Sequence, residues 1–315
     1  MSGEFDRIRA IIARLGASAA PDIGDDCAVV PNGPGTLVVS TDLSVEGTHF
    51  RTSWLSYEEI GWRCAAGALS DLAAQGASCT GVVVSVGSPA SAASDAVVRL
   101  MSGVGDAVRE AGGVVLGGDL SLAPQWVVDV TVLGRAERPV LRRGAREGDL
   151  IYVSGMVGGA RAALRSWLRG EEPAPGARRA FAHPVPRIDL GRELARAGIT
   201  SMIDLSDGLA GDVRHLARGS GRHFVIELEQ LPLHPDVEAA AALAGLAAPI
   251  FAAAGGEDYE LLFTCPPACA PAVEQVGKRL GQTVTRIGIV TGEMGEGVRL
   301  LLDGPQTIEG FDHFA

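Results

Sequence analysis

GDDCAVV at residues 24–30 and LVVSTDLSVEGTHF at residues 37–50 combine two apolar runs with a concentration of acidic and hydroxyl side chains. Asp25 and Asp26 precede the first run, and both runs are typical of β-strands. We expect the second run, Leu37–Val39, to end by presenting Ser40, Thr41 and Asp42. Oxygen donors gathered at strand ends suit a Mg²⁺ site better than a packed core.

Three later segments repeat this theme. Asp71 ends an Ala-rich helical pattern, Asp119 follows a double glycine, and DLSDG at residues 204–208 stands between a strand-like and a helix-like run. We expect these carboxylates to converge and to hold metal-bound polyphosphate. Two structural alternatives stay open. In the first, Asp71 is a buried structural carboxylate and not a ligand. In the second, Ser206 or Asp207 serves as the N-cap of the helix that follows.

The overall charge limits the class of partner. The chain has 315 residues, with 27 basic against 38 acidic side chains and a formal net charge of −11. Such a surface repels nucleic acid and anionic lipid, so we expect neither as a partner. It also repels a bare nucleotide, so a divalent cation has to bridge any phosphate to the carboxylates. We find no signal peptide and no apolar run of membrane-spanning length.

The cysteine pattern favours a reducing compartment. None of the five cysteines belongs to a C-x-x-C pair, and the Cys265–Cys269 spacing across two prolines is poor for zinc. We therefore expect buried free thiols and a cytoplasmic protein. The cysteines are Cys27, Cys64, Cys79, Cys265 and Cys269.

Alternating helical and strand patterns predict a two-domain α/β or α+β protein. The polar, basic and turn-rich stretch 137–148 is the expected boundary, which gives domains 1–138 and 139–315. In the first domain we predict helices over Phe5–Leu15, from Tyr57 after an N-cap at Ser56, and over Ser94–Ala111, with strands over Gly81–Val86, Val114–Leu116 and Trp126–Leu133.

In the second domain we predict a strand over Asp149–Val153, a loop over Glu171–Arg179 and a helix around Ile188–Ala197. The glycine-rich turn 155–159 lacks the G-x-G-x-x-G spacing and is expected to be a packing turn. Asp212 is expected to be a solvated or packing carboxylate. His49 is either structural or a ligand beside the acidic cluster.

Seven motifs taken together resemble a known family. GDDCAVV, STDLSVEGTHF, ALSDLAA, LGGDLS, DLSDGL, GGEDYELLF and the terminal GFDHF occur in the order found in the thiamine-monophosphate kinases of the PurM-like ATP-binding superfamily. The similarity covers essentially the whole chain. It implies a two-domain PurM-like fold with a C-terminal α/β domain. It also implies an N-terminal sheet and helices that form a homodimer interface, and transfer of the γ-phosphoryl group of ATP to thiamine monophosphate with several Mg²⁺ ions.

The resemblance also implies site residues. Metal-associated positions match Asp26, Ser40, Thr41, Asp42, Asp71, Asp119, Asp204 and Asp207. Nucleotide contacts match Gly118, Asp119, Arg142 and Ser206, and contacts to thiamine monophosphate match His49, Glu257 and Phe311. One departure concerns the family's Arg-Ser-Gly-Ala, which is Arg-Arg-Gly-Ala at residues 142–145. Alignment on Gly144 favours Arg142 over Arg143 as the nucleotide contact.

Other PurM-like enzymes and a non-catalytic acidic metal-binding protein are the competing interpretations. Selenophosphate synthetases use a reactive Cys or selenocysteine near the N-terminus, and the first cysteine here is Cys27. The hydrogenase maturation dehydratases use a C-terminal cysteine, whereas this sequence ends Asp-His-Phe-Ala. Aminoimidazole ribonucleotide synthetase is a further relative. Dependence of ATP turnover on thiamine monophosphate separates the kinase from a metal-binding protein.

Overall fold

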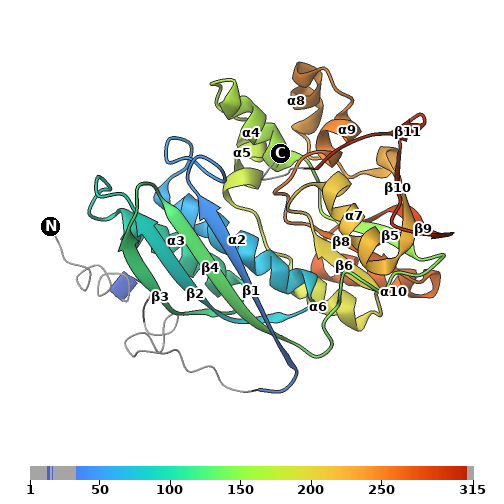
Figure 1. Ribbon diagram of the computed structural model, residues 1–315, viewed down its shortest axis with the longest axis horizontal. Helices are drawn as coiled ribbons and strands as arrows, with labels where there is room; N and C mark the ends of the chain where they lie inside the picture. Colours follow the sequence, from blue (N-terminus) through green and yellow to red (C-terminus); the bar gives the residue numbers. More distant parts are fainter. Residues whose placement is uncertain (1–12, 15, 17–32, 311–315) are drawn as a thin grey trace. The chain divides into compact units, whose positions relative to one another are not determined.

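The computed structural model describes residues 13–14, 16 and 33–310 (Figure 1). It confirms a mixed α/β fold with two sheets. The described chain forms two compact units: the first contains residues up to Leu72 together with Ala77–Glu137, and the second contains Ala73–Gly76 with the chain from Arg138 onward. The predicted first helix lies largely outside the described residues, as do Asp25 and Asp26.

The first unit is built on a four-stranded sheet. Its strand order is β1 (Thr36–Val45), β4 (Val127–Ala136), β2 (Ser78–Ser88) and β3 (Val114–Leu122). β4 pairs antiparallel with both β1 and β2, whereas β2 and β3 are parallel and are joined through a crossover helix.

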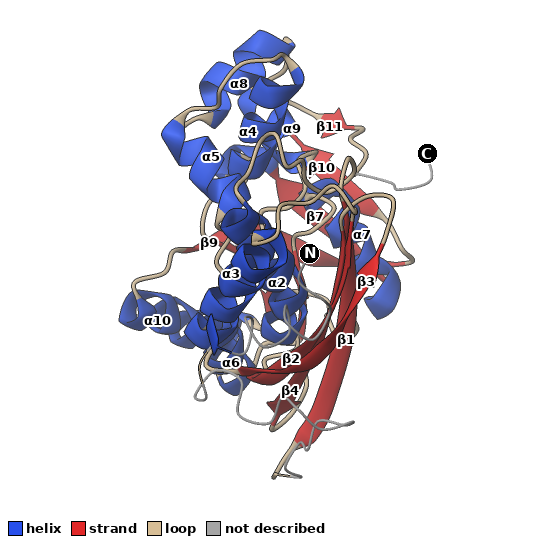
Figure 2. Ribbon diagram, turned by 90° about the vertical axis from the view of Figure 1, so that its left-hand side faces the viewer, coloured by secondary structure: helices blue, strands red, loops and turns tan. Residues whose placement is uncertain are grey.

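Two helices, α2 (Tyr57–Ala74) and α3 (Ala96–Glu110), cover one face of this sheet (Figure 2). The predicted start of α2 is confirmed as a reciprocal capping box. The Ser56 N–H donates to the Glu59 carboxylate at 2.8 Å, and the Glu59 N–H donates to Ser56 Oγ at 3.2 Å. The turn before α2 is therefore fixed by local sequence.

The two faces of the sheet differ in composition. Under the helices, Val128, Val130 and Val132 of β4 are fully buried. On the opposite face, Leu37, Val39 and Leu43 of β1 remain 48%, 57% and 52% exposed. Strand alternation places these two sets on opposite sides, so the first unit has one covered face and one open, partly apolar face.

Two strands are longer than the sequence predicts. β1 continues through Ser40, Thr41 and Asp42, and β3 continues through the double glycine 117–118 and Asp119. The predicted strand ends at these motifs are therefore wrong. Pairing with β4 on one side and β2 on the other keeps these polar residues extended, which local composition alone does not reveal.

The second unit contains a seven-stranded mixed sheet in which β7 and β10 are parallel and the other described pairs are antiparallel. The order is β11 (Pro305–Gln306), β10 (Val298–Leu301), β7 (Arg222–Glu227), β9 (Val284–Met294), β5 (Leu150–Ser154), β8 (Leu261–Cys265) and β6 (Ser201–Asp204).

Two helices, α7 and α10, pack against strands of this sheet. α7 packs on β6, β7 and β10, and α10 packs against β9 and α6. The α-helices are α4 (Gly159–Leu168), α5 (Pro175–Ala182), α6 (Ile188–Arg196), α7 (Leu209–Ser220), α8 (Val237–Ala244), α9 (Ala248–Ala253) and α10 (Ala270–Leu280). One prediction is wrong here: α5 begins inside the expected loop, since Pro175 occupies its first turn, where proline is favourable.

Helices α2 and α3 cross where each has a glycine. A Cβ at Gly61 would lie 1.9 Å from the Leu100 carbonyl oxygen, and one at Gly103 would lie 1.9 Å from that of Glu58. Beside this crossing, Arg99 forms a two-point ion pair with Glu58 at 2.8 and 2.9 Å. The small residues of α2 therefore allow close packing against a helix as well as against the sheet.

We expect Gly61→Ala and Gly103→Ala each to destabilise the protein by about 1–3 kcal/mol, because an added methyl group forces the two helix backbones apart. Urea unfolding measures the change. Gly117→Ala is the matched control, since no heavy atom lies within 4 Å of a Cβ there. Equal effects at all three positions would show that the crossing is not closely packed.

Candidate active site

In the first unit, β1 and α2 bring two predicted site residues into contact. Strand alternation directs Ser40 and Asp42 toward the helix side of the sheet. There Ser40 Oγ donates a 2.5 Å hydrogen bond to Asp71 Oδ2. Asp71 lies in the last turns of α2, so its carboxylate faces the strand that carries Ser40. These side chains form one group of oxygen donors.

Thr41 and Asp119 belong to the other face. Thr41 Oγ1 donates to Asp129 Oδ1 at 2.8 Å on the open side of the sheet. Asp119 is exposed and lies beside Ser85 in the β2–β3 register, and Ser85 lies opposite Asp129. Because register neighbours point to the same face, the first unit does not bring these two side chains together with Ser40.

The glycine before Asp119 has a packing reason of its own. A Cβ at Gly118 would lie 1.9 Å from the Val84 carbonyl oxygen of the adjacent strand. A glycine is therefore needed at position 118 because the neighbouring strand β2 passes close to it. The contact of Gly118 with the nucleotide stays a prediction.

His49 lies in the turn after β1. Its Nδ1 accepts a 3.0 Å hydrogen bond from the Val45 N–H, and its carbonyl oxygen accepts a 3.3 Å hydrogen bond from Arg63 Nε. Acceptance at Nδ1 places the ring proton of the neutral imidazole on Nε2. The turn therefore fixes both the ring orientation and the tautomer.

In the second unit, the DLSDG motif connects β6 to α7. Asp204 ends β6 at 4% exposure, and the N-cap of α7 is Gly208, with φ of 100° and no side-chain cap bond. Instead, the Asp207 N–H donates to the carboxylate of Asp212 at 3.2 Å. Asp212 thus turns back from the first turn of α7 and holds the loop.

Asp207, Asp212 and His215 each offer a ligand atom, and these atoms lie within 4.8 Å of one another. Among the described residues, this is the one such cluster of three. Burial raises the pKa of Asp212 to about 8, with the charges of Asp204 and Asp207 adding to the effect. Burial also lowers the pKa of His215, and the Arg142 charge lowers it further. A cation bound here would relieve the repulsion between the carboxylates.

The donor chemistry of this cluster fits a divalent cation. Two carboxylates supply the hard oxygen ligands that Mg²⁺ prefers, although an imidazole is a less favoured ligand for it. In the first unit, Ser40, Asp42 and Asp71 likewise present oxygen atoms on one face of the sheet. Both units therefore carry residues that suit Mg²⁺.

The GGEDYE motif, residues 255–260, pairs with the DLSDG loop through main-chain hydrogen bonds. The Glu257 N–H donates to the Ser206 carbonyl at 2.8 Å, and the Tyr259 N–H donates to the Leu205 carbonyl at 2.9 Å. A Cβ at Gly256 would lie 2.4 Å from the Ser206 carbonyl oxygen. The second glycine of the motif is therefore required by the contact between the two loops.

This pairing holds a strained backbone. Glu257 and Tyr259 have φ of 68° and 51°, a region that residues other than glycine seldom adopt. Such conformations persist only where the surroundings impose them. Here the residue after each strained position, Asp258 and Glu260, is anchored through its carboxylate. The pairing of the loops thus fixes the backbone of Glu257, a predicted substrate contact.

The first anchor is Asp258. Its two carboxylate oxygens accept the Gly158 N–H, at 3.0 and 2.9 Å, at the N-terminus of α4. Burial raises the pKa of Asp258 well above its ordinary value, and the donated N–H opposes that rise. The partial positive charge of the helix terminus also favours the carboxylate.

The second anchor is Glu260, whose side chain is 6% exposed. Arg187 donates to both of its oxygens, at 2.9 and 2.5 Å, and Ser154 Oγ donates to Oε2 at 2.5 Å. Ser154 Oγ in turn accepts the Leu261 N–H at 2.8 Å. This network ties the end of the loop to β5 and β8.

Sequence analysis named Asp212 without assigning it to the site, and it assigned no role to His215, Asp258 and Glu260. The interval from Asp212 to His215 is i, i+3, which puts both side chains on one face of a helix that starts at a predicted site, so this pair had a readable signal. Asp258 and Glu260 had none, because their partners lie about 100 and 73 positions away. Asp212 was expected to be a solvated or packing carboxylate, and its 1% exposure and its bond to the Asp207 N–H fit the packing role.

The structure separates Arg142 from Arg143. The Arg142 charge lowers the pKa of both Asp212 and His215, so its guanidinium lies within electrostatic range of the cluster. Arg143 lines a different cavity. Asp26 and Phe311 lie outside the described residues. Gly310, which precedes Phe311, packs on the DLSDG loop, where its Cβ would lie 3.1 Å from the Asp207 carbonyl oxygen.

We expect Arg187→Met to destabilise the protein by about 3 kcal/mol, because it leaves the Glu260 carboxylate buried and unpaired. The double variant Arg187→Met/Glu260→Gln should recover most of that loss, which a double-mutant cycle in urea measures. Arg192→Met, which breaks an exposed ion pair on α6, is the control and should cost less than about 1 kcal/mol. Additive losses in the double variant would contradict a coupled anchor.

Comparison with known proteins places these motifs in a family. The model of the AIR synthase related protein N-terminal domain matches residues 24–136, and that of the C-terminal domain matches residues 146–300. Thiamine-monophosphate kinase of Mycobacterium tuberculosis is 36% identical over 82% of this chain and 80% of its own. The thiamine-monophosphate kinase of Aquifex aeolicus is 34% identical over 99% of this chain and 98% of its own.

Solved structures agree. The thiamine-monophosphate kinase of Stenotrophomonas maltophilia K279a has a TM-score of 0.83 and 31% identity, covering 95% of this chain and 96% of its own. A structure described as AaThiL complexed with AMPPCP and TMP has a TM-score of 0.80 and 32% identity, covering 99% and 97%. The hydrogenase maturation protein HypE, at 19% identity and a TM-score of 0.80, shows the fold alone. No described helix is both long and apolar enough to cross a membrane. This chain belongs to the thiamine-monophosphate kinase family.

Proposed function

We propose that this protein transfers the γ-phosphoryl group of ATP to thiamine monophosphate, giving thiamine diphosphate and ADP. The observation that carries the proposal is the pairing of the DLSDG and GGEDYE loops, which sets Ser206 and Asp207 beside a strained Glu257. Relatives of that activity match the chain over nearly its full length, and one of them is described with both AMPPCP, an ATP analogue, and TMP.

The second unit supplies the proposed nucleotide contacts. Ser206 and Asp207 immediately precede α7, a helix of 12 residues whose first N–H groups and dipole favour phosphate oxygens. Arg142 adds a positive charge near the same cluster. Gly118 and Asp119 of the first unit complete the proposed nucleotide set.

The proposed Mg²⁺ ligands are carboxylate and hydroxyl oxygen atoms. When bound, Mg²⁺ neutralises negative charge on the polyphosphate, which a protein of net charge −11 would otherwise repel. The helix-side group and the DLSDG group each supply carboxylates, and Thr41 and Asp119 supply oxygen atoms from the open face. The full proposed set is Asp26, Ser40, Thr41, Asp42, Asp71, Asp119, Asp204 and Asp207.

Acceptor recognition is proposed for His49, Glu257 and Phe311. The thiazolium of thiamine monophosphate is cationic, so a carboxylate and an aromatic face both favour it. The Glu257 backbone is held by its hydrogen bond to the Ser206 carbonyl, and Gly310, the residue before Phe311, packs against the DLSDG loop. Both observations support acceptor binding next to the nucleotide contacts of the second unit.

The chemistry needs no general base. A phosphate monoester is largely ionised at pH 7, so its oxygen attacks the γ-phosphorus directly in line with the leaving ADP. The side chains contribute by orienting the two substrates and by holding the charges that stabilise the transition state. The strained Glu257 backbone and its two anchors supply such orientation.

An assay of ADP formation from ATP against a panel of phosphorylated acceptors, with Mg²⁺ and with excess chelator, tests the function. We expect turnover only with thiamine monophosphate and only with the divalent cation. Asp42→Asn should lower kcat by about 10²-fold, the scale on which an electrostatic stabiliser acts. Asp106→Asn, an exposed carboxylate paired with Arg109, is the control and should keep full activity. Full turnover in chelator would refute the metal-assisted reaction.

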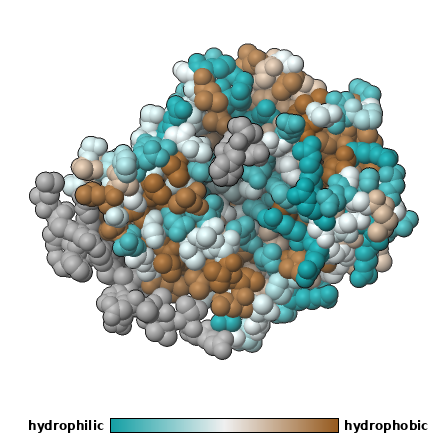
Figure 3. Space-filling model, viewed as in Figure 1, coloured by the Kyte–Doolittle hydropathy of each residue, from teal (hydrophilic) through white to brown (hydrophobic). Residues whose placement is uncertain are grey.

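We also propose a homodimer made through the open face of the first unit. Leu37, Val39 and Leu43 of β1 are about half exposed there. Figure 3 shows apolar surface gathered over the strands of this face. A row of exposed apolar side chains along one strand is typical of an interface. A second copy offers the same patch, so an isologous contact covers both.

Sedimentation at micromolar concentration should therefore give a dimer. Leu37→Lys/Val39→Lys should dissociate it, because each substitution buries a lysine at the interface and the cross-strand neighbours, Arg135 and Leu133, offer no carboxylate. Leu168→Lys, which alters an apolar residue of α4 with 54% exposure, is the matched control and should remain dimeric. A wild-type monomer under these conditions would refute the proposed interface.

A cytoplasmic location is part of the same proposal. Cys64, Cys79 and Cys265 are buried free thiols, and burial raises the pKa of each to about 12. Inert thiols of this kind are compatible with a reducing compartment. Cys27 lies outside the described residues.

A further inference from the structure

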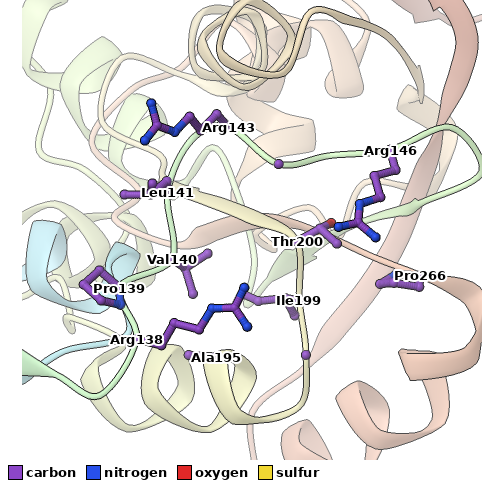
Figure 4. Close-up of a pocket in the computed structure, with 12 residues that line it drawn as sticks. Arg138, Pro139, Val140, Leu141, Arg143, Arg146, Ala195, Ile199, Thr200 and Pro266 are labelled. Carbon is purple, nitrogen blue, oxygen red and sulfur yellow. The ribbon is translucent and has the colours of Figure 1, made fainter. Parts of the chain in front are cut away.

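The second unit has a basic cavity whose lining includes none of the residues proposed for the reaction, although Arg142 lies between two of its lining residues, Leu141 and Arg143. It measures about 410 Å³ and lies between the segment 138–146, the end of α6 and Pro266 (Figure 4). Thr200, which lines it, precedes β6, whereas Asp204 of the DLSDG motif ends that strand. The two sites thus lie at opposite ends of β6.

Three arginines line the cavity: Arg138, Arg143 and Arg146. Figure 4 shows the Arg138 and Arg146 side chains extending toward Ile199 and Thr200, whereas Arg143 lies at the edge and its side chain extends away from them. None of the three guanidinium groups forms a salt bridge with a described residue. The lining contains no acidic side chain, in a protein of net charge −11.

Nearby polar groups are already satisfied. The buried carboxylate of Asp149 accepts the Arg146 N–H at 2.9 Å and Thr200 Oγ1 at 2.6 Å, so it is held by neutral donors below the cavity. Arg138 also lies over the C-terminal turn of α6 (Figure 4), where a cation interacts favourably with the helix dipole.

The remaining wall is apolar. Pro139, Val140, Leu141, Ile199 and Pro266 form it. Convergent guanidinium groups match anions with several oxygen atoms, since each presents a planar fork of donors. An apolar wall next to them suits an organic body attached to such an anion. A single carboxylate would leave most of this charge unmatched.

We propose that this cavity is a second, metal-independent binding site for a small molecule with a diphosphate group, held by Arg138 and Arg146 with Arg143 at the rim. The inference goes beyond the proposed reaction and does not depend on it. Both proposed products, ADP and thiamine diphosphate, carry that group, and the two are distinguished by the experiment.

The test is calorimetric titration of the full-length protein in excess chelator, which removes metal-bridged binding at the carboxylates. Inorganic pyrophosphate is the first probe and inorganic phosphate its single-phosphate comparison. ADP and thiamine diphosphate, titrated separately, distinguish the two organic sources. We expect pyrophosphate to bind, and to bind at least tenfold more tightly than phosphate.

Arg138→Gln/Arg146→Gln should weaken pyrophosphate binding at least tenfold and leave kcat unchanged. Arg165→Gln/Arg179→Gln removes two exposed arginines, one on α4 and one on α5, and is the matched control for net charge. Absence of binding to the wild type, or equal weakening in the control, would overturn the proposal. Loss of kcat in the double variant would also overturn it, because the cavity would then belong to the reaction site.

Leu141→Glu tests the cavity without removing an arginine. Leu141 is 39% exposed, so the fold should tolerate the change, and the new carboxylate would occupy the guanidinium groups. We expect the same tenfold loss of pyrophosphate affinity. Two results together would reject the site: a lowered melting temperature of the double arginine variant, and unchanged pyrophosphate binding by Leu141→Glu. The arginines would then serve stability.

Discussion

The hydrogen bonds between the DLSDG and GGEDYE loops are the contact on which the second unit's site depends. They fix Glu257 in a left-handed conformation that its side chain disfavours, and the cost is offset by two anchors that follow it in the chain. Asp258 binds the N-terminus of α4, and Glu260 binds Arg187 and Ser154. The loop geometry therefore rests on three elements beyond the two motifs.

Charge is the second constraint. A protein of net charge −11 that handles phosphates has to separate its acidic and basic groups. The Asp207 cluster gathers carboxylates at one end of β6, and the cavity of Arg138, Arg143 and Arg146 gathers cations at the other. The first cluster suits a cation and the second an anion, so one short strand separates two sites of opposite preference.

Much of the fold could be read from local patterns. The capping box at Ser56 and Glu59 and the helix α3 were predicted because their signals lie within a few residues. The lengths of β1 and β3 were not, since their polar ends are extended only through pairing with other strands. The start of α5 was missed because a loop-like composition hid a favourable first-turn proline.

The sequence by itself determined the family, the acidic character and the chemical type of the site residues, because these depend on residue identity and order. The tertiary structure decided which of those residues meet. Ser40 contacts Asp71, whereas Thr41, its neighbour, points to the opposite face by strand alternation. Asp258 and Glu260 acquire their anchoring roles only from partners distant in the chain, and no local pattern encodes such a contact.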